Sequence, residues 1–137
     1  MSSTPLEVTL QLQPQARFDV IDVARELRAE YDDVLERYKS TLYCSYHTTA
    51  GYFDQQLCAR LQHSREKLQE FMGVFQRVFP QNADYEHDKM HLRDELTEAQ
   101  KVNEPLNADS HLTFISSGLR NCVTYENGAN HPVFFVD

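Results

Sequence analysis

The sequence has no tryptophan, only three cysteines and no apolar run long enough to cross a bilayer. The cysteines are odd in number and form no CxxC pair, so the sequence indicates neither a disulfide framework nor a cysteine zinc knuckle. Cys44 and Cys122 alternate within expected strands, and Cys58 lies on an expected helix. We expect all three to be small buried hydrophobes rather than nucleophiles.

Several familiar catalytic signatures are missing as well. The chain contains no glycine-rich phosphate loop, no GxSxG elbow and no paired-carboxylate signature. The usual sequence signals of nucleotide binding, acyl transfer and glycoside hydrolysis are therefore absent.

Positive charge is also scarce. The chain carries 13 lysines and arginines against 21 aspartates and glutamates, a formal net charge of -8. Such a field repels phosphate backbones and anionic lipid headgroups, so we expect neither nucleic acid nor a membrane as principal partner. The N-terminus lacks the basic and apolar parts of a signal peptide, and we expect a cytoplasmic protein.

What is present suits one globular domain spanning 1–137. A chain of 137 residues, 41% of them hydrophobic, can bury a core without covalent staples. The last expected strand ends at Asp137 without a capping loop, which predicts a polypeptide that continues further.

The first third of the chain alternates between strand and helix patterns. Apolar and polar residues alternate over 6–13, which predicts a strand with one solvated face. After a short extended piece at 18–21, Asp22 can cap a helix whose apolar positions continue to Tyr38. Alternation returns over 40–46, so we expect a strand that delivers His47 at its end.

The remainder is mostly helical before the final strands. Helical spacing over 53–79, with a break near Ser64, predicts a long amphipathic helix that Pro80 stops. The segment 81–107 has little periodicity, which is typical of a functional connection with a short helical turn. Near the C-terminus, Asp109 can cap another helix, and Gly118 suits the left-handed position after its last turn.

The final segment predicts a hairpin. Residues 122–125 and 133–136 read as strands, and Asn127-Gly128 between them is a strong turn signal. Together with the earlier elements, this order predicts an α+β domain with a largely antiparallel sheet.

Three histidines follow or begin regular elements, and each is a candidate site residue. His47 is followed by Thr48 and Thr49, which offer an imidazole and two hydroxyls, and then by Ala50 and Gly51, which let the backbone turn and approach a ligand. Such a group can bind a metal, bind phosphate or move a proton. The alternative is an ordinary polar turn between a strand and a helix.

The second candidate, His87, lies in the stretch Tyr85-Glu86-His87-Asp88. His91 follows four residues later, a spacing that would place both imidazoles on one helical face and could suit zinc. The acidic neighbours favour a solvated loop instead, and no HExxH motif is present.

The third candidate, His111, follows Asn107 and Asp109 in the first turn of an expected helix. Unpaired N–H groups and the positive end of the helix dipole attract anions there, so a phosphate could bind. The alternative is a histidine that contacts water or the preceding loop. We expect His63 to lie on the surface and His131 to be a turn residue.

These three stretches, in this order and spacing, resemble the YjbQ-like family, also called the secondary thiamine-phosphate synthase family. Residues 47–51 match the family's HTTAG, 85–88 match its Y-x-H-D, and 107–112 with Gly118 match its N-x-D-x-H stretch and following glycine. The resemblance begins near 18–23, which is similar to the family's extended segment before its first helix, and runs to the C-terminal strand.

The resemblance implies an α+β fold with a sandwich-type sheet and packed helices, assembled as a homotrimer with the histidine sites near subunit contacts. It also implies a thiamine-phosphate-synthase-like transferase that joins a pyrimidine diphosphate to a thiazole phosphate. In that reading His47, His87 and His111 gather as catalytic residues around a divalent metal, zinc or magnesium, or around the phosphate of a small molecule.

The same resemblance assigns roles to the polar neighbours. Thr48 and Thr49 would donate to ligand oxygens, and Asp88 or Asp109 would hold an imidazole in position. Asn107 completes the implied set of ligand-binding residues.

Two departures from the family pattern bear on catalysis. Where the family places Asn-Glu after HTTAG, this chain has Gln55-Gln56, which removes a carboxylate that could bind a metal or act as a base. Where the family has G-T-W-Q, this chain has 130–133 and no tryptophan. The alternatives are a non-catalytic ligand-binding or assembly domain, or a metal-dependent hydrolase with three protein ligands and bound water.

Overall fold

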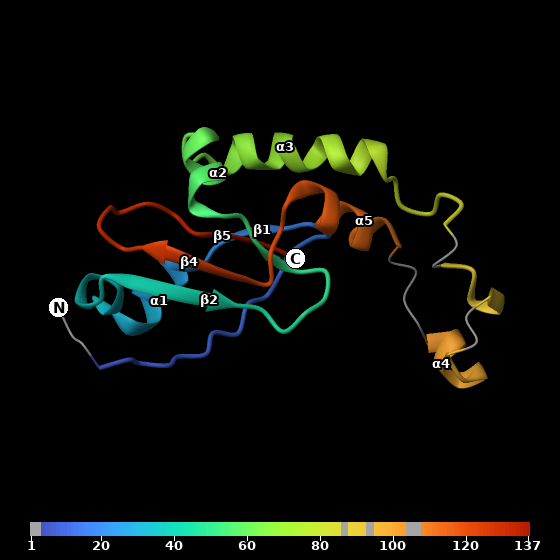
Figure 1. Ribbon diagram of the computed structural model, residues 1–137, viewed down its shortest axis with the longest axis horizontal. Helices are drawn as coiled ribbons and strands as arrows, with labels where there is room; N and C mark the ends of the chain where they lie inside the picture. The colour runs from blue at the N-terminus through green and yellow to red at the C-terminus, as the bar shows by residue number, and fades with distance from the viewer. Residues whose placement is uncertain (1–3, 86–87, 93–94, 104–107) are drawn as a thin grey trace.

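Helices and antiparallel strands build the protein, which confirms the α+β class predicted from the sequence (Figure 1). The computed structural model describes residues 4–85, 88–92, 95–103 and 108–137. Within these ranges, no helix has the length and apolar character needed to cross a bilayer.

A three-stranded antiparallel sheet forms one layer of the body. Its order is β1 (Val20–Asp22), β5 (Phe134–Val136) and β3 (Gly51–Tyr52). The central strand β5 pairs Val136 with both Val20 and Gly51, and all three of its residues are buried. A strand covered on both faces is typically a continuous apolar run, as Phe134–Val136 is.

A two-stranded antiparallel sheet forms the second layer. β2 (Ser40–Cys44) pairs along its whole length with β4 (Cys122–Glu126). Burial alternates in β4, where Val123 and Tyr125 are buried and their neighbours are exposed. The sheet therefore has one face toward the core and one toward solvent.

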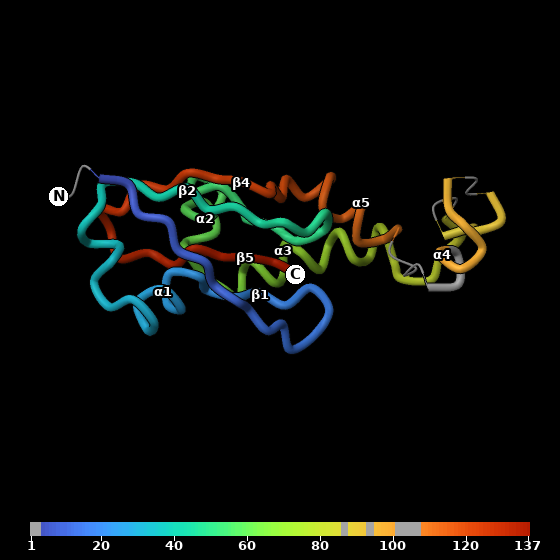
Figure 2. Tube along the Cα trace, turned by 90° about the horizontal axis from the view of Figure 1, so that it is seen from below, coloured from blue at the N-terminus to red at the C-terminus, as the bar shows by residue number. Residues whose placement is uncertain are grey.

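Figure 2 shows the two layers edge on. Aromatic side chains from both layers pack against one another. The ring of Tyr43 on β2 lies 5.6 Å from that of Tyr52 on β3 and 5.7 Å from that of Tyr125 on β4. Phe135 on β5 continues the cluster, 4.9 Å from Tyr52. Such tilted and edge-to-face pairs add to the free energy gained from burial alone.

The helix predicted from Asp22 to Tyr38 is shorter than expected. Asp22 does cap α1 (Val23–Tyr31), because its carboxylate accepts a hydrogen bond from the N–H of Arg25 at 3.3 Å. The helix ends where Asp32 adopts a φ of +54°, and a 3-10 helix, η1 (Val34–Arg37), follows.

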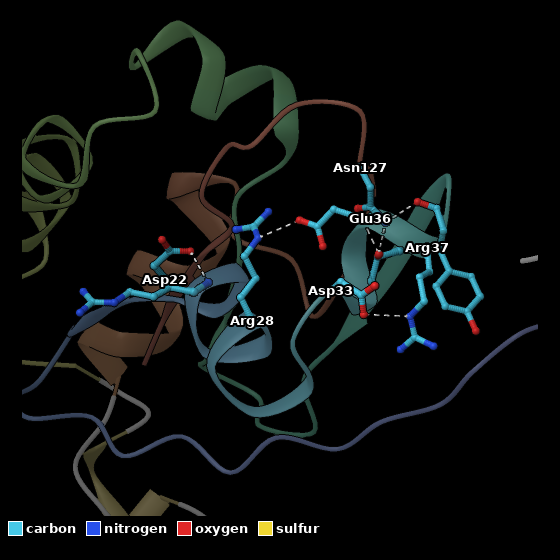
Figure 3. A network of polar contacts seen from close by, with 9 residues as sticks. Asp22, Arg28, Asp33, Glu36, Arg37 and Asn127 are labelled. Carbon is cyan, nitrogen blue, oxygen red and sulfur yellow. Dashed lines mark hydrogen bonds and ion pairs between the residues drawn. The ribbon is translucent and has the colours of Figure 1, made fainter. Parts of the chain in front are cut away.

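Charged side chains surround this junction, all exposed except the half-buried Arg28 (Figure 3). Arg28 pairs with Glu36 at 3.3 Å, and Arg37 pairs with Asp33 at 3.4 Å. These pairs lie on the outer side of α1 and η1, where solvent weakens their contribution to stability.

The predicted break in the long amphipathic helix is confirmed. α2 (Gln55–Arg60) ends before Gln62 and His63, which adopt φ values of +59° and +53°. Ser64 then caps α3 (Arg65–Val78) by accepting from the N–H of Lys67 at 3.2 Å. Figure 1 shows both helices along one side of the body.

The described residues of the connection after α3 form only short helices, as predicted. They include a 3-10 helix, η3 (Met90–Leu92), and α4 (Glu98–Asn103), which Figure 1 shows apart from the two sheets. α5 (Ala108–Ser117) returns to the body and packs against α3. Gly118 follows it with a φ of +85°, so the predicted left-handed position is confirmed.

Two strand predictions are wrong. Residues 6–13 are extended but belong to neither sheet of the described chain. β4 and β5 form no hairpin with each other, since β4 pairs with β2 and β5 lies between β1 and β3. Asn127 extends the ladder with the β2 side instead, since its backbone N–H donates to Lys39 O at 2.9 Å and its side chain donates to Tyr38 O at 3.1 Å and to Thr41 Oγ1 at 2.8 Å.

Candidate functional site

A groove of about 790 Å³ lies between the N-terminal segment and the body. Residues 5–13 form one wall, and Figure 2 shows this segment crossing from the side of β2 to the side of β1. The opposite wall comes from α1, η1, β2, β3 and β5. A groove of this volume is within the range of small-molecule sites.

Apolar and polar residues of 6–13 both line the groove, but they differ in burial. Val8, Leu10 and Leu12 are half-buried against the core, whereas the polar residues between them are exposed. The predicted two-fold pattern therefore holds from Val8 to Leu12, whereas Leu6 is 52% exposed and the expected strand pairing does not form. Val23 and Leu27 on α1 supply apolar surface opposite them.

Tyrosine side chains also line the groove. Tyr38, Tyr43, Tyr46 and Tyr52 line it. Burial raises the pKa of Tyr43 and of Tyr52 to about 12, so both are neutral at physiological pH. The Tyr43 hydroxyl is buried and has no hydrogen-bond partner among the described residues.

The charges on the groove wall are few and of one sign. Glu7 and Asp137 contribute carboxylates, and His47 contributes an imidazole. No lysine or arginine lines the groove within the described part of the chain. An anionic ligand would therefore meet negative charge without a permanent positive partner.

The segment 47–51 forms a loop fastened to the start of β4. The side-chain amide of Asn121 donates to His47 O at 2.7 Å and to Ala50 O at 3.3 Å. The His47 backbone N–H donates to Ser45 Oγ at 3.2 Å. The loop backbone is thus held in place while the His47 and Thr48 side chains are exposed and Thr49 is half-buried.

Gly51 permits a close backbone approach, as predicted, but the approaching groups belong to the protein. A Cβ at this position would lie 2.4 Å from Arg120 O and 2.9 Å from Phe114 Cε2. Tyr52 and Arg120 then exchange backbone hydrogen bonds of 2.8 and 2.9 Å. This contact places the end of the first motif against α5, the helix that carries His111.

The second motif also reaches α5. Asp88 Oδ1 accepts a hydrogen bond of 3.1 Å from the N–H of Ala108, the first residue of the helix. The Tyr85 hydroxyl donates to Pro80 O at 2.7 Å. Desolvation, with the charges of Asp109 and Asp88, raises the pKa of Tyr85. Glu86 and His87 lie outside the described residues.

Asp109 is not the helix cap that the sequence predicted. It lies inside the first turn of α5, is 2% exposed and pairs with Arg17, whose Nη2 is 2.5 Å from its Oδ1. Arg17 Nη2 also donates to Ser110 Oγ at 2.8 Å. The polar groups of this turn, which we call the α5 cluster (Arg17, Asp88, Asp109 and Ser110), therefore bind one another. Asn107 lies outside the described residues.

The structure brings the three motif segments to one helix without establishing a three-histidine pocket. His111 is half-buried in α5, whereas His47 lines the groove and His111 does not. Among the described residues, no group of three His, Cys, Asp or Glu side chains could hold a metal ion. Because His87 is not described, the predicted pocket stays a prediction. Gln56 is exposed and does not line the groove.

Sequence reasoning missed two side-chain pairs. Cys58 is buried as expected, but the prediction is wrong for Cys44 and Cys122, which are exposed and lie opposite each other on β2 and β4. His63 is half-buried instead of exposed, and its ring stacks on that of His131 at 3.7 Å. Only the strand register could have revealed the cysteine pair from sequence.

Comparison of the chain with protein-family models, with curated proteins and with solved structures finds no match.

Proposed function

We propose that the protein is a non-catalytic binding domain for an elongated, largely apolar small molecule that is neutral or positively charged. The groove of about 790 Å³ carries this proposal. Its walls are mainly aliphatic and tyrosine side chains, the surfaces that bury the apolar body of a ligand. A segment outside both sheets closes one side, so a ligand can enter without breaking a strand ladder.

The charge preference follows from the groove wall and from the whole chain. Glu7 and Asp137 line the groove, and the chain has a formal net charge of -8. Tyrosine faces also attract cations, by about 0.5–1 kcal/mol at exposed sites. Tyr43 lines the same wall and is neutral at physiological pH.

A set of three amphiphiles with the same alkyl chain tests this proposal. Decylammonium, decanol and decanoate differ only in the charge of the head group. Calorimetric titration below their micelle concentrations should rank their affinities in that order. Equal affinity for decanoate, or no binding of any of the three, would contradict the proposal.

Matched variants locate the binding site. Leu42 is 65% exposed and lines the groove, whereas Ile115 is 75% exposed on α5 and does not. Leu42→Gln should weaken decylammonium binding about tenfold, which corresponds to about 1.4 kcal/mol. Ile115→Gln should leave it unchanged. Equal losses in both variants would place the binding elsewhere.

A second candidate function rests on a different observation, the meeting of all three motif segments at α5. Gly51 contacts Phe114, and Asp88 binds the first N–H of the helix. We propose on this basis a YjbQ-like site in which His47, His87 and His111 bind zinc, magnesium or a phosphorylated small molecule. The same proposal includes assembly as a homotrimer, location in the cytoplasm and a weak thiamine-phosphate-synthase-like activity.

Elemental analysis separates the two candidates. Protein purified without chelator should contain stoichiometric metal if the histidine site exists, and a His47→Ala, His111→Ala double variant should lose it. Light scattering on the same samples measures the subunit number. Metal absent from both proteins would contradict a metal site and leave either phosphate binding by these residues or the groove function.

A further inference from the structure

Two exposed thiols lie side by side across the two-stranded sheet. Cys44 ends β2, Cys122 begins β4, and the strand register pairs them directly. Their sulfur atoms are 3.0 Å apart, although 78 positions separate the two residues in sequence. Cys44 also lines the groove, whereas Cys122 does not.

The hydrogen-bond pattern shows which kind of cross-strand position this pair occupies. Just beyond it, Ser45 N–H donates to Asn121 O at 2.7 Å, and at the other end of the ladder Asn127 N–H donates to Lys39 O at 2.9 Å. Hydrogen-bonded and non-hydrogen-bonded pairs alternate along an antiparallel ladder. The pair next to Ser45 is therefore a non-hydrogen-bonded one.

That position suits a covalent bridge. The Cα atoms of a non-hydrogen-bonded pair are about 4.5 Å apart, within the range that disulfides span, roughly 4.4–6.8 Å. The two strands therefore need no backbone rearrangement to bring the sulfur atoms to bonding distance. Both thiols are exposed, so a small reagent can reach them.

We propose that Cys44 and Cys122 form a reversible intramolecular disulfide by exchange with a small-molecule disulfide such as oxidised glutathione. One protein thiolate attacks the small disulfide, forms a mixed disulfide and releases one small thiolate. The second protein thiolate then attacks the protein sulfur of that bond and releases the other. The two protein S–H bonds are replaced by one S–S bond, and one small disulfide is reduced to two thiols.

Cys58 provides an internal reference for the chemistry. Its side chain is fully buried, with Sγ 3.2 Å from the Tyr125 hydroxyl. Burial raises the pKa of the Cys58 thiol and the hydrogen bond with Cys122 raises that of Cys44, so it is the lack of access that separates Cys58 from the exposed pair. Cys58 should stay reduced while the other two react.

Mass spectrometry after redox equilibration tests the proposal. The protein is incubated with chelator and a series of reduced and oxidised glutathione mixtures, quenched with acid, unfolded and alkylated. Reduced mixtures should yield three alkyl groups per chain, and oxidised mixtures one, on Cys58, with the peptides containing Cys44 and Cys122 linked. Two separate glutathionyl groups, links between chains, or three free thiols throughout would overturn the proposal.

Two variants that each lack one cysteine of the pair supply the controls. In the oxidised mixture Cys44→Ser and Cys122→Ser should each take up one glutathionyl group and form no internal link. Wild-type protein should unfold at a higher urea concentration when oxidised than when reduced, because the bond closes a long loop in the unfolded chain. Cys44→Ser should show no such shift, and the same shift in that variant would contradict the proposed bond.

Discussion

The groove and the α5 cluster show how differently two candidate sites can be built in one molecule. The groove is largely apolar and open, and Tyr43 on its wall has a buried hydroxyl without a hydrogen-bond partner among the described residues. The α5 cluster is polar and closed, because Arg17 and Asp109 neutralise each other and Asp88 binds the helix N-terminus. Polar groups that pair with one another stabilise the fold, whereas an exposed apolar surface is typical of a binding site.

Gly51 lies against Arg120 and Phe114, and substituting it should have the largest effect. In Gly51→Ala the new methyl group meets Arg120 O at 2.4 Å, so backbone must move, and we expect a loss of about 3 kcal/mol in the free energy of unfolding. Urea denaturation measures this loss. Gly128→Ala is the control, since nothing lies within 4 Å of its Cβ position. Equal effects in the two variants would contradict the tight contact.

Arg17→Ala tests whether the α5 cluster is structural. It leaves the Asp109 carboxylate, 2% exposed, without its cation, so we expect about 2 kcal/mol of destabilisation. Arg37→Ala breaks an exposed pair with Asp33 and should cost less than about 0.5 kcal/mol. The double variant Arg17→Ala, Asp109→Ala should be more stable than Arg17→Ala alone. If it is not, the buried charge is not the cause.

Tyr43 tests the groove wall through pH. Its pKa is raised from the usual 10.0 to about 12, so the unfolded chain loses this proton first and stability falls as pH rises between those values. Tyr43→Phe should reduce that alkaline loss by about 1–2 kcal/mol and change stability little at neutral pH. Tyr46→Phe is the control, because Tyr46 is 93% exposed. Identical pH profiles for wild type and Tyr43→Phe would contradict the burial effect.

His47→Ala should have the smallest effect on stability. The imidazole is exposed and the loop is held through backbone groups, so we expect a change within about 0.5 kcal/mol. Asn121→Ala removes the amide that fastens the same loop and should cost more, about 1 kcal/mol. Comparable losses would show that the imidazole itself holds the loop. The denaturation midpoints of the two variants measure this difference.

Local signals in the sequence predicted the helices well. Asp22 and Ser64 cap the helices that follow them, and Gly118 takes the left-handed conformation after α5. In each case the cause lies within a few residues of the effect, so pattern and composition are enough.

Long-range partners could not be predicted in this way. Asn127-Gly128 indicated a hairpin, yet β4 pairs with β2, which lies far earlier in the chain. Asp109 matched a capping pattern, but its charge is neutralised by Arg17, 92 positions away. The groove was missed for the same reason. The alternation of 6–13 indicates that one face is apolar, but it does not indicate which part of the fold that face lies against.

The position of β5 between β1 and β3 has a consequence for how the protein folds. Asp22 pairs with Phe134, which lies far away in sequence, so the two strands cannot form as a local hairpin. During synthesis, β1 and β3 therefore remain without their common partner until residues 134–136 have left the ribosome. Such non-local pairing slows folding, and it leaves apolar strands exposed on the nascent chain in the meantime.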